Sequence, residues 1–231
     1  VPYVISSNTN AGSGDCLTCD YVVLPDATLT IDQNKAVHNI TVYEGGTLHI
    51  ANGKTLSVHA LILRRDDDTK APQVTFGNES SAIHLQFNEV YFDTRIDDSR
   101  YYWFTLPYNS FVKNISYSNE AANGKMATYR TDFYVRRYDG ARRTDDANAG
   151  TQAKNYWTHV ADAGANYTLQ AGIGYQLGLA DQAGIIQADG HPHAKRVMRF
   201  TMTPDDETWN TKERSNQKSA RVAPSQAADP R

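Results

Sequence analysis

The sequence predicts an all-β protein in which a short, right-handed parallel β-helix-like region precedes an antiparallel β-sandwich or jelly-roll-like domain. Short alternating apolar runs recur about every 20 residues between positions 20 and 90, which is typical of stacked coils. Longer aromatic runs then alternate with loops rich in Asp, Asn, Gly and Ala, as in antiparallel sandwiches. The chain also has 14 Tyr beside 7 Phe and 3 Trp, and aromatic residues favour strands.

Chain length and changes in residue composition indicate how the chain divides into segments. Its 231 residues exceed a typical domain of roughly 100 to 150 residues. From Thr203 onwards only Trp209 and Val222 are large apolar residues, too few to offset the entropy lost on ordering a chain. We therefore expect a lead-in over 1–19, a β-helix-like repeat region over 20–91, a β-sandwich domain over 92–202, and a linker or disordered tail over 203–231.

The repeat region shows one recurring pattern of strand, tight turn and second strand. Residues 28–31 (Thr-Leu-Thr-Ile) recur as residues 47–50 (Thr-Leu-His-Ile), and two weaker copies follow. If these coils stack, alternate apolar residues face inward: Leu29, Ile31, Val42, Leu48, Ile50, Leu56, Val58, Leu61 and Leu63. A meander of antiparallel hairpins is the alternative, because turns such as Asn52-Gly53 also close hairpins.

The second region carries the longer strands of the predicted sandwich. These are expected over 101–108, 112–117, 131–138, 167–170, 174–179 and 196–202. Alternation divides the first run into two faces, Tyr101, Trp103 and Thr105 on one and Tyr102, Phe104 and Leu106 on the other. The second set is the more apolar, so we predict that it faces the core.

The only two cysteines, Cys16 and Cys19, lie three positions apart ahead of a strand-like run. A redox CxxC stands at the start of a helix in a βαβ unit, and a zinc site needs a second pair of ligands. Neither context is present in the sequence. We expect a local disulfide or a reduced pair that pins an N-terminal turn and holds no metal, and an oxidised pair would agree with an exported protein.

Charge and hydropathy limit the classes of partner. The formal net charge is −3 with no basic stripe, which argues against nucleic acid. No run approaches the roughly 18 to 20 apolar residues of a membrane span, so we expect no membrane insertion. The chain begins without a leader and ends in linker composition, which predicts a trimmed fragment of a longer protein.

Residues that could carry catalysis or bind metal each have a simpler explanation. Asp93, Asp97 and Asp98 resemble a glycosidase carboxylate pair, but Arg95 and Arg100 beside them predict a salt-bridged turn. Asp66 to Asp68 are expected in a solvated turn, since their spacing does not match a calcium loop. The candidate histidines are expected to lie in exposed loops: His38, His49, His59, His84, His191 and His193. We therefore expect no catalytic residue, no metal and no cofactor.

Exposed aromatic residues are the better candidates for a binding site. Trp and Tyr on a β-sandwich hold sugar rings by stacking, while neighbouring polar groups bond the hydroxyls. The candidates in this chain are Tyr101, Trp103, Tyr108, Tyr156 and Trp157. Ordinary packing in the sheet is the alternative for Trp103 and Trp157, because aromatic residues are favoured in strands in any case.

Four runs in combination resemble a known group of proteins. They are Gly-Thr-Leu-His-Ile at 46–50, Trp-Phe-Thr-Leu-Pro-Tyr at 103–108, Tyr-Asp-Gly-Ala at 138–141 and Leu-Gln-Ala-Gly-Ile-Gly-Tyr at 169–175. Over residues 20–202 the chain is similar to multidomain cell-surface or secreted β proteins of Bacteroidetes, which are largely uncharacterised. The resemblance implies coil-like repeats before a β-sandwich, further β domains in the same chain, and a role in adhesion, surface structure or glycan contact.

These observations predict a noncatalytic extracellular or cell-surface module. Its role would be structural, adhesive or polymer-binding, with a glycan or another cell-surface polymer or protein as partner. The alternative is a polysaccharide-active enzyme or its accessory domain, because parallel β-helices can carry a catalytic groove along their coils. The small number of predicted coils argues against a long groove and hence against the enzyme.

Overall fold

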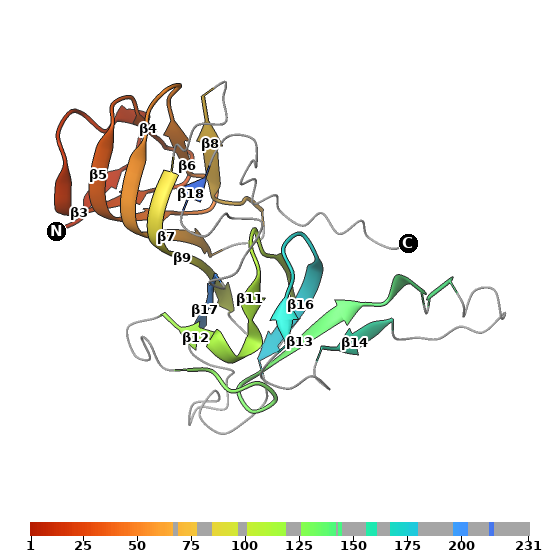
Figure 1. The fold of residues 1–231 in the computed structure, drawn as a ribbon. Coiled ribbons are helices and arrows are strands. Elements are labelled where there is room, and N and C mark those ends of the chain that lie inside the picture. The colour runs from red at the N-terminus through yellow and green to blue at the C-terminus, as the bar shows by residue number, and fades with distance from the viewer. Residues whose placement is uncertain are drawn as a thin grey trace.

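The chain forms an all-β protein with several sheets in the computed structural model, which confirms the predicted class (Figure 1). The structure describes residues 1–66, 69–77, 85–96, 101–118, 126–141, 143–144, 156–160, 167–179, 196–202 and 213–214. Figure 1 shows the N-terminal strands stacked in the upper part of the molecule, with antiparallel strands below them.

The N-terminal part consists of two parallel sheets between which the chain passes back and forth. The first contains β1 (Tyr3–Ile5), β3 (Cys16–Val23), β5 (Lys35–Val42), β7 (Leu56–Arg65) and β9 (Leu85–Ile96). The second contains β2 (Thr9–Asn10), β4 (Thr28–Ile31), β6 (Thr47–Ile50) and β8 (Gln73–Phe76). All neighbouring strands within these two sets are parallel, so the alternative of antiparallel hairpins is wrong.

The sequence repeat corresponds to one step along both sheets. Thr28–Ile31 pair one to one with Thr47–Ile50, and Val42 of β5 pairs with Leu63 of β7. The prediction of inward-facing residues is confirmed, since all of them are buried: Leu29, Ile31, Val42, Leu48, Ile50, Leu56, Val58, Leu61 and Leu63. Burying one such side chain contributes about 1.5 to 3 kcal/mol, so the apolar interior holds the steps together.

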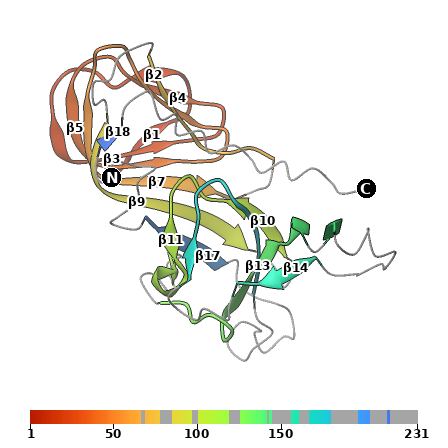
Figure 2. The ribbon, with the colours of Figure 1, turned by 45° about the vertical axis from the view of Figure 1, so that its right-hand side comes forward.

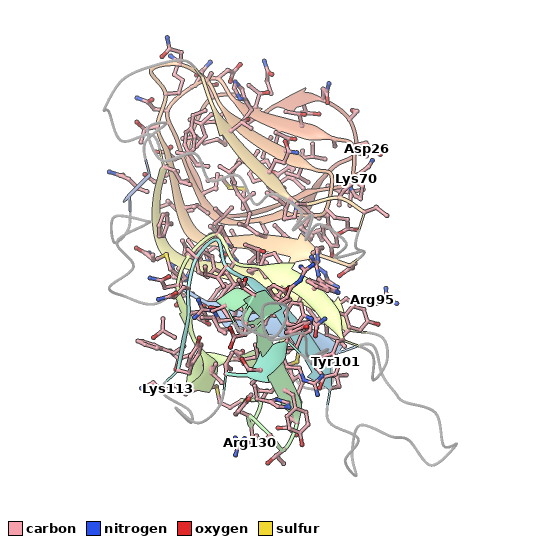
Figure 3. All side chains as sticks on the ribbon, turned by 90° about the vertical axis from the view of Figure 1, so that its right-hand side faces the viewer. Asp26, Lys70, Arg95, Tyr101, Lys113 and Arg130 are labelled. Atoms are coloured by element: carbon pink, nitrogen blue, oxygen red, sulfur yellow. A yellow bond between two sulfur atoms is a disulfide. The ribbon has the colours of Figure 1, made fainter. Side chains whose placement is uncertain are left out.

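The turns between the sheets stack in the same way as the strands. The amide of Asp26 donates to the carbonyl of Gly45 at 3.2 Å, and the amide of Gly45 donates to the carbonyl of Ala71 at 3.1 Å. The Asp26 carboxylate also pairs with the Lys70 ammonium, and Figure 3 shows the two side chains together. Asp26 and Gly45 have φ angles of 63° and 72°, a region that suits Gly and, less well, Asp.

A disulfide between Cys16 and Cys19 pins the N-terminal end of the first sheet. Cys16 pairs with Val37 and Asp20 pairs with Asn39, so β3 has more residues than β5 between these two pairs. The extra residues of β3 form a bulge that contains the disulfide. The bond closes this bulge, which is the oxidised form of the local pairing that the sequence predicted.

Strand β9 connects the two parts of the chain. Residues 85–94 extend the parallel sheet beside β7, and residues 91–96 pair antiparallel with β17 (Arg196–Thr201). Beyond β17 the sheet ends with β12 (Ser116–Tyr117). The predicted domain boundary between residues 91 and 92 therefore lies inside one continuous strand. Within the predicted tail, β18 (Glu213–Arg214) pairs with β9, while Trp209 lies outside the described residues.

A four-stranded antiparallel sheet lies next to the end of the large sheet (Figure 2). Its order is β10 (Tyr102–Thr105), β16 (Gly174–Leu179), β13 (Phe133–Tyr138) and β14 (Trp157–His159). A small ribbon pairs β11 (Ser110–Phe111) with β15 (Thr168–Leu169). The run predicted as a strand over 112–117 instead forms a 3-10 turn, η1 (Val112–Asn114), and the short strand β12.

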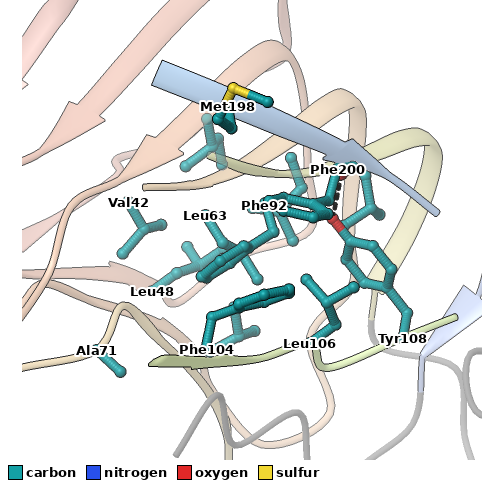
Figure 4. Packing of buried hydrophobic residues seen from close by; sticks show 14 of the residues in the cluster. Val42, Leu48, Leu63, Ala71, Phe92, Phe104, Leu106, Tyr108, Met198 and Phe200 are labelled. Carbon is teal, nitrogen blue, oxygen red and sulfur yellow. Dashed lines mark hydrogen bonds between the residues drawn. The ribbon is translucent and has the colours of Figure 1, made fainter. Parts of the chain in front are cut away.

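Aromatic rings fill the space between the two sheets (Figure 4). Phe200 of β17 lies 6.2 Å from Phe92 of β9 and 5.0 Å from Phe104 of β10, measured between ring centroids. Phe104 in turn contacts Tyr175 of β16 at 5.7 Å. The same buried cluster includes Leu63 and the other inward residues of the parallel sheets. One continuous core therefore serves both parts of the chain.

Candidate functional site

One face of the antiparallel sheet points into the core and the other points outward. Phe104 and Leu106 are buried and Tyr102 is partly buried against the core, whereas Tyr101 and Trp103 are half-exposed, in agreement with the predicted division of this strand. Half-exposed residues from all four strands or their ends form one outer surface, here called the aromatic face: Tyr101, Trp103, Tyr134, Arg136, Tyr138, Tyr156, Trp157 and Gln176.

Two tryptophans, Trp103 and Trp157, are in contact on this face. Trp103 on β10 and Trp157 on β14 have ring centroids 4.5 Å apart and planes at 88°, an edge-to-face contact. Because β16 and β13 separate these strands, the two indoles reach toward each other above the sheet. Tyr138 continues the row, 5.3 Å from Trp157 and 6.4 Å from Tyr156. Such ring contacts add about 0.5 to 1.5 kcal/mol each, so the rings are held in place.

Tyr101 is positioned by a glycine on the neighbouring strand. A Cβ atom at Gly178 would lie 2.9 Å from the Tyr101 ring, so only glycine leaves room for the ring to lie flat against β16. The guanidinium of Arg136 lies over the Tyr101 ring, and its carbon is 4.2 Å from the ring centroid. Figure 3 shows Tyr101 at the edge of the lower part of the molecule, near Arg95.

The layer beneath the face is rigid and neutral. Tyr175 is buried and its hydroxyl accepts a hydrogen bond from the amide of Gln170 at 2.9 Å. Burial raises the pKa of Tyr175 to about 12, so this hydroxyl stays protonated at ordinary pH. The four strands contain no Asp or Glu. The described side chains of the aromatic face are therefore aromatic, amide and guanidinium groups.

The structure brings together four of the five aromatic residues that the sequence nominated. Tyr101, Trp103, Tyr156 and Trp157 belong to the aromatic face, but Tyr108 does not. Tyr108 is fully buried, and its hydroxyl donates to the carbonyl of Phe200 at 2.8 Å (Figure 4). It is a core residue with no ring surface to offer a ligand, because the alternation that buries Phe104 and Leu106 continues to Tyr108.

Sequence reasoning missed half of the face. Tyr134, Arg136 and Tyr138 alternate along β13, and Gln176 lies at the middle of β16. The alternation in residues 134–138 was a usable signal for a shared face. Residues 134–138 lie near Trp103 because β16 pairs with both β10 and β13. No local sequence pattern predicts this pairing.

The acidic candidate Asp93 is paired, as predicted, but with a different partner. Its carboxylate accepts two 2.8 Å hydrogen bonds from Arg199 on β17. Burial lowers the pKa of Arg199, but these bonds and the Asp93 charge outweigh it and raise the pKa above its usual value. The expected pairing of Asp93 with neighbouring arginines is therefore corrected, because the antiparallel register places Arg199 opposite Asp93. Asp97, Asp98 and Arg100 lie outside the described residues.

Two of the candidate histidines do stack across the parallel sheet. The rings of His38 and His59 are parallel within 1° and 5.3 Å apart, and they line a hollow of about 560 Å³ with Asn88 and Leu17. His49 lies on the other sheet, where its ring contacts Thr75 at 2.9 Å. The remaining histidine candidates lie outside the described residues: His84, His191 and His193.

The described residues contain neither a cluster of metal ligands nor a membrane-spanning helix. Among the residues that the structure describes, no group of three or more His, Cys, Asp or Glu is placed to hold a metal ion. Asp66, once considered for calcium, is paired with Arg64 at 2.9 Å, while Asp67 and Asp68 are not among the described residues. No helix in the described part of the chain is both long and apolar enough to cross a membrane.

Comparison with protein-family models, curated proteins and solved structures gives no match for this chain. The site therefore has to be interpreted from its own geometry and chemistry.

Proposed function

We propose that this chain is a noncatalytic, extracellular or cell-surface module that binds glycans on its aromatic face. The observation that carries the proposal is the contact of Trp103 with Trp157, 4.5 Å apart at 88°, on the outer side of a sheet. Sugar rings present apolar C–H faces that stack on such rings, while amide and guanidinium groups bond the hydroxyls. Gln176 and Arg136 supply these polar groups within the same surface.

The architecture supports the role of a scaffold that presents the aromatic face to a ligand. We propose that the two parallel sheets form a short right-handed parallel β-helix and that the antiparallel strands form a β-sandwich stacked on its end. The one-to-one register of β4 with β6 and of β5 with β7 supports the first part. A disulfide at the N-terminal end and the resemblance to multidomain surface proteins of Bacteroidetes support an extracellular address.

The test is binding to an array of neutral and acidic polysaccharides, followed by titration of the strongest ligand. Replacing Trp103 or Trp157 with Ala is expected to weaken binding about tenfold, because losing one stacking ring removes roughly 1 to 2 kcal/mol. Tyr3→Ala is the matched control, since Tyr3 is an exposed aromatic residue on the distant strand β1. Failure of the wild-type chain to bind any polysaccharide, or equal loss in all three variants, would refute the proposal.

The same samples separate a binding module from an enzyme. A noncatalytic module releases no oligosaccharides from the ligand during prolonged incubation, as followed by a reducing-sugar assay. Turnover that survives in an independently prepared sample would favour the alternative, a polysaccharide-active enzyme.

A further inference from the structure

We infer that the ligand of the aromatic face is an acidic polysaccharide, bearing carboxylate or sulfate groups, and that Arg136 is the residue that holds the anionic group. This inference rests on the proposed glycan-binding function and adds to it a charge class and an anchoring residue. It stands on the position of one guanidinium, its contact with the Tyr101 ring, and its lack of an ion-pair partner within the described part of the chain.

Arg136 lies in the middle of the sheet. It pairs with Gln176 of β16 on one side and with His159 of β14 on the other, and Gln176 pairs in turn with Trp103 of β10. The row across all four strands is therefore Trp103, Gln176, Arg136 and His159. Arg136 therefore shares a row with Trp103 and lies on the same surface as the two tryptophans.

The orientation of this guanidinium is fixed before any ligand arrives. Its carbon lies 4.2 Å from the centroid of the Tyr101 ring, and Tyr101 is itself seated against Gly178. The Nε atom is buried and has no hydrogen-bond partner. Arg136 thus carries a donor that no described residue satisfies, and a planar guanidinium is suited to carboxylate or sulfate oxygens.

Among the residues that the structure describes, Arg136 differs from other half-buried arginines in its charge environment. Arg64 is paired with Asp66 and Arg199 with Asp93, whereas within the described residues Arg136 forms no ion pair. A second cation, Arg143, donates from Nη1 to the Tyr138 hydroxyl at 3.1 Å at the edge of the same face. Desolvating an unpaired cation costs free energy that an anionic ligand recovers.

Single-stranded nucleic acid also combines stacking bases with negative charge and is the competing class of ligand for the aromatic face. Such proteins track a phosphate backbone with a basic groove, and their domains carry a basic surface. Here the formal net charge is −3 and the face offers one central arginine and one at its edge. One charge per few rings matches a glycan with spaced acidic groups better than a phosphate on every nucleotide.

The test compares ligands that differ only in charge. Wild-type chain is titrated with polygalacturonate and with its fully methyl-esterified form, and with dextran sulfate and neutral dextran. We expect at least about tenfold tighter binding to one acidic ligand than to its neutral counterpart. The pair that responds identifies carboxylate or sulfate as the recognised group.

The variants test the anchor itself. Arg136→Gln is expected to weaken acidic binding about tenfold and leave neutral binding unchanged, with Arg136→Lys in between because lysine keeps the charge but loses the fork. Arg137→Gln is the matched control, because Arg137 is the next residue on β13, has the same charge and lies on the opposite face of the strand. Circular dichroism and thermal melts establish that all three variants are folded.

Each remaining outcome overturns the inference. Equal binding of charged and neutral ligands, or equal effects of the Arg136 and Arg137 variants, shows that Arg136 is not an anion anchor, while glycan binding itself survives. Loss of all polysaccharide binding in the wild-type chain removes the proposed function as well. Tighter binding to a single-stranded oligonucleotide than to every polysaccharide replaces the glycan with nucleic acid.

Discussion

At the scale of single residues, buried polar groups show how this chain pairs its charges. Asp93 is 2% exposed, and Arg199 binds it with two parallel hydrogen bonds. Arg64 is its neighbour on β7 in the register, but the Arg64 guanidinium pairs with Asp66, so Arg199 is the partner that encloses Asp93. A charge enclosed in this way is stable only while its partner is present.

Removing this carboxylate is expected to destabilise the fold strongly. Asp93→Ala leaves the half-buried Arg199 without its carboxylate partner, which should lower the free energy of unfolding by about 3 to 5 kcal/mol. Urea titration followed by circular dichroism measures the loss. Asp26→Asn breaks the exposed pair with Lys70 and should cost below about 1 kcal/mol. Similar losses in both variants would contradict the assignment of Asp93 as an enclosed pair.

Single residues were predictable when a local pattern determined their side of the sheet. Alternation placed Trp103 outward and Phe104 inward, and the structure agrees. Tyr108 has the same parity as Phe104, and the alternation of buried residues continues past the strand to its ring, so the same pattern also predicts a core position for Tyr108. The partner of Asp93 could not be predicted, because Arg199 is far away in the sequence and adjacent only through the pairing of β9 with β17.

At the scale of elements, the turns between the parallel sheets are as constrained as the strands. A Cβ atom on Gly46 would lie 2.9 Å from the carbonyl oxygen of Leu24, 3.0 Å from that of Tyr43 and 3.1 Å from that of Val23. All three neighbours are backbone atoms of stacked turns, which cannot move aside independently. The glycine is therefore required by close approach of the backbone.

Alanine at this turn should push neighbouring steps apart. We expect Gly46→Ala to lower the free energy of unfolding by about 1 to 3 kcal/mol, the usual cost of overpacking, as measured by urea titration. Gly174→Ala is the control, because nothing lies within 4 Å of the added methyl group, and it should cause no loss. A stable Gly46→Ala chain would show that the stacked turns yield more easily than this geometry implies.

Elements with strong local signals were predicted well, and elements defined by their neighbours were not. The recurrence of Thr28–Ile31 as Thr47–Ile50 appeared in the sequence and is a one-to-one pairing in the structure. Strand β9 was divided at residue 92 because the composition changes there. Its backbone continues from Leu85 to Ile96, since β7 pairs along one edge and β17 along the other.

At the scale of the whole molecule, the two parts share both a strand and a core. Besides β9, the buried Arg65 at the end of β7 donates from Nη2 to the carbonyl of Trp103 at 2.7 Å. This bond connects the parallel sheets directly to the strand that carries the aromatic face. The orientation of the face relative to the N-terminal part is therefore set by buried contacts.

This continuity predicts one cooperative unfolding transition, which core damage in the N-terminal part should shift as a whole. Trp103 and Trp157 lie in the second part, so in a chain carrying Trp209→Phe the tryptophan fluorescence reports only on that part, while circular dichroism reports on every strand. Leu61 of β7 is fully buried, and Leu61→Ala should cost about 2 to 5 kcal/mol. If the parts unfold together, both signals shift to lower denaturant by the same amount. Gln73→Ala, an exposed position on β8, should shift neither. A fluorescence transition that stays in place in Leu61→Ala while the circular dichroism transition moves would show two independent domains, despite the shared strand.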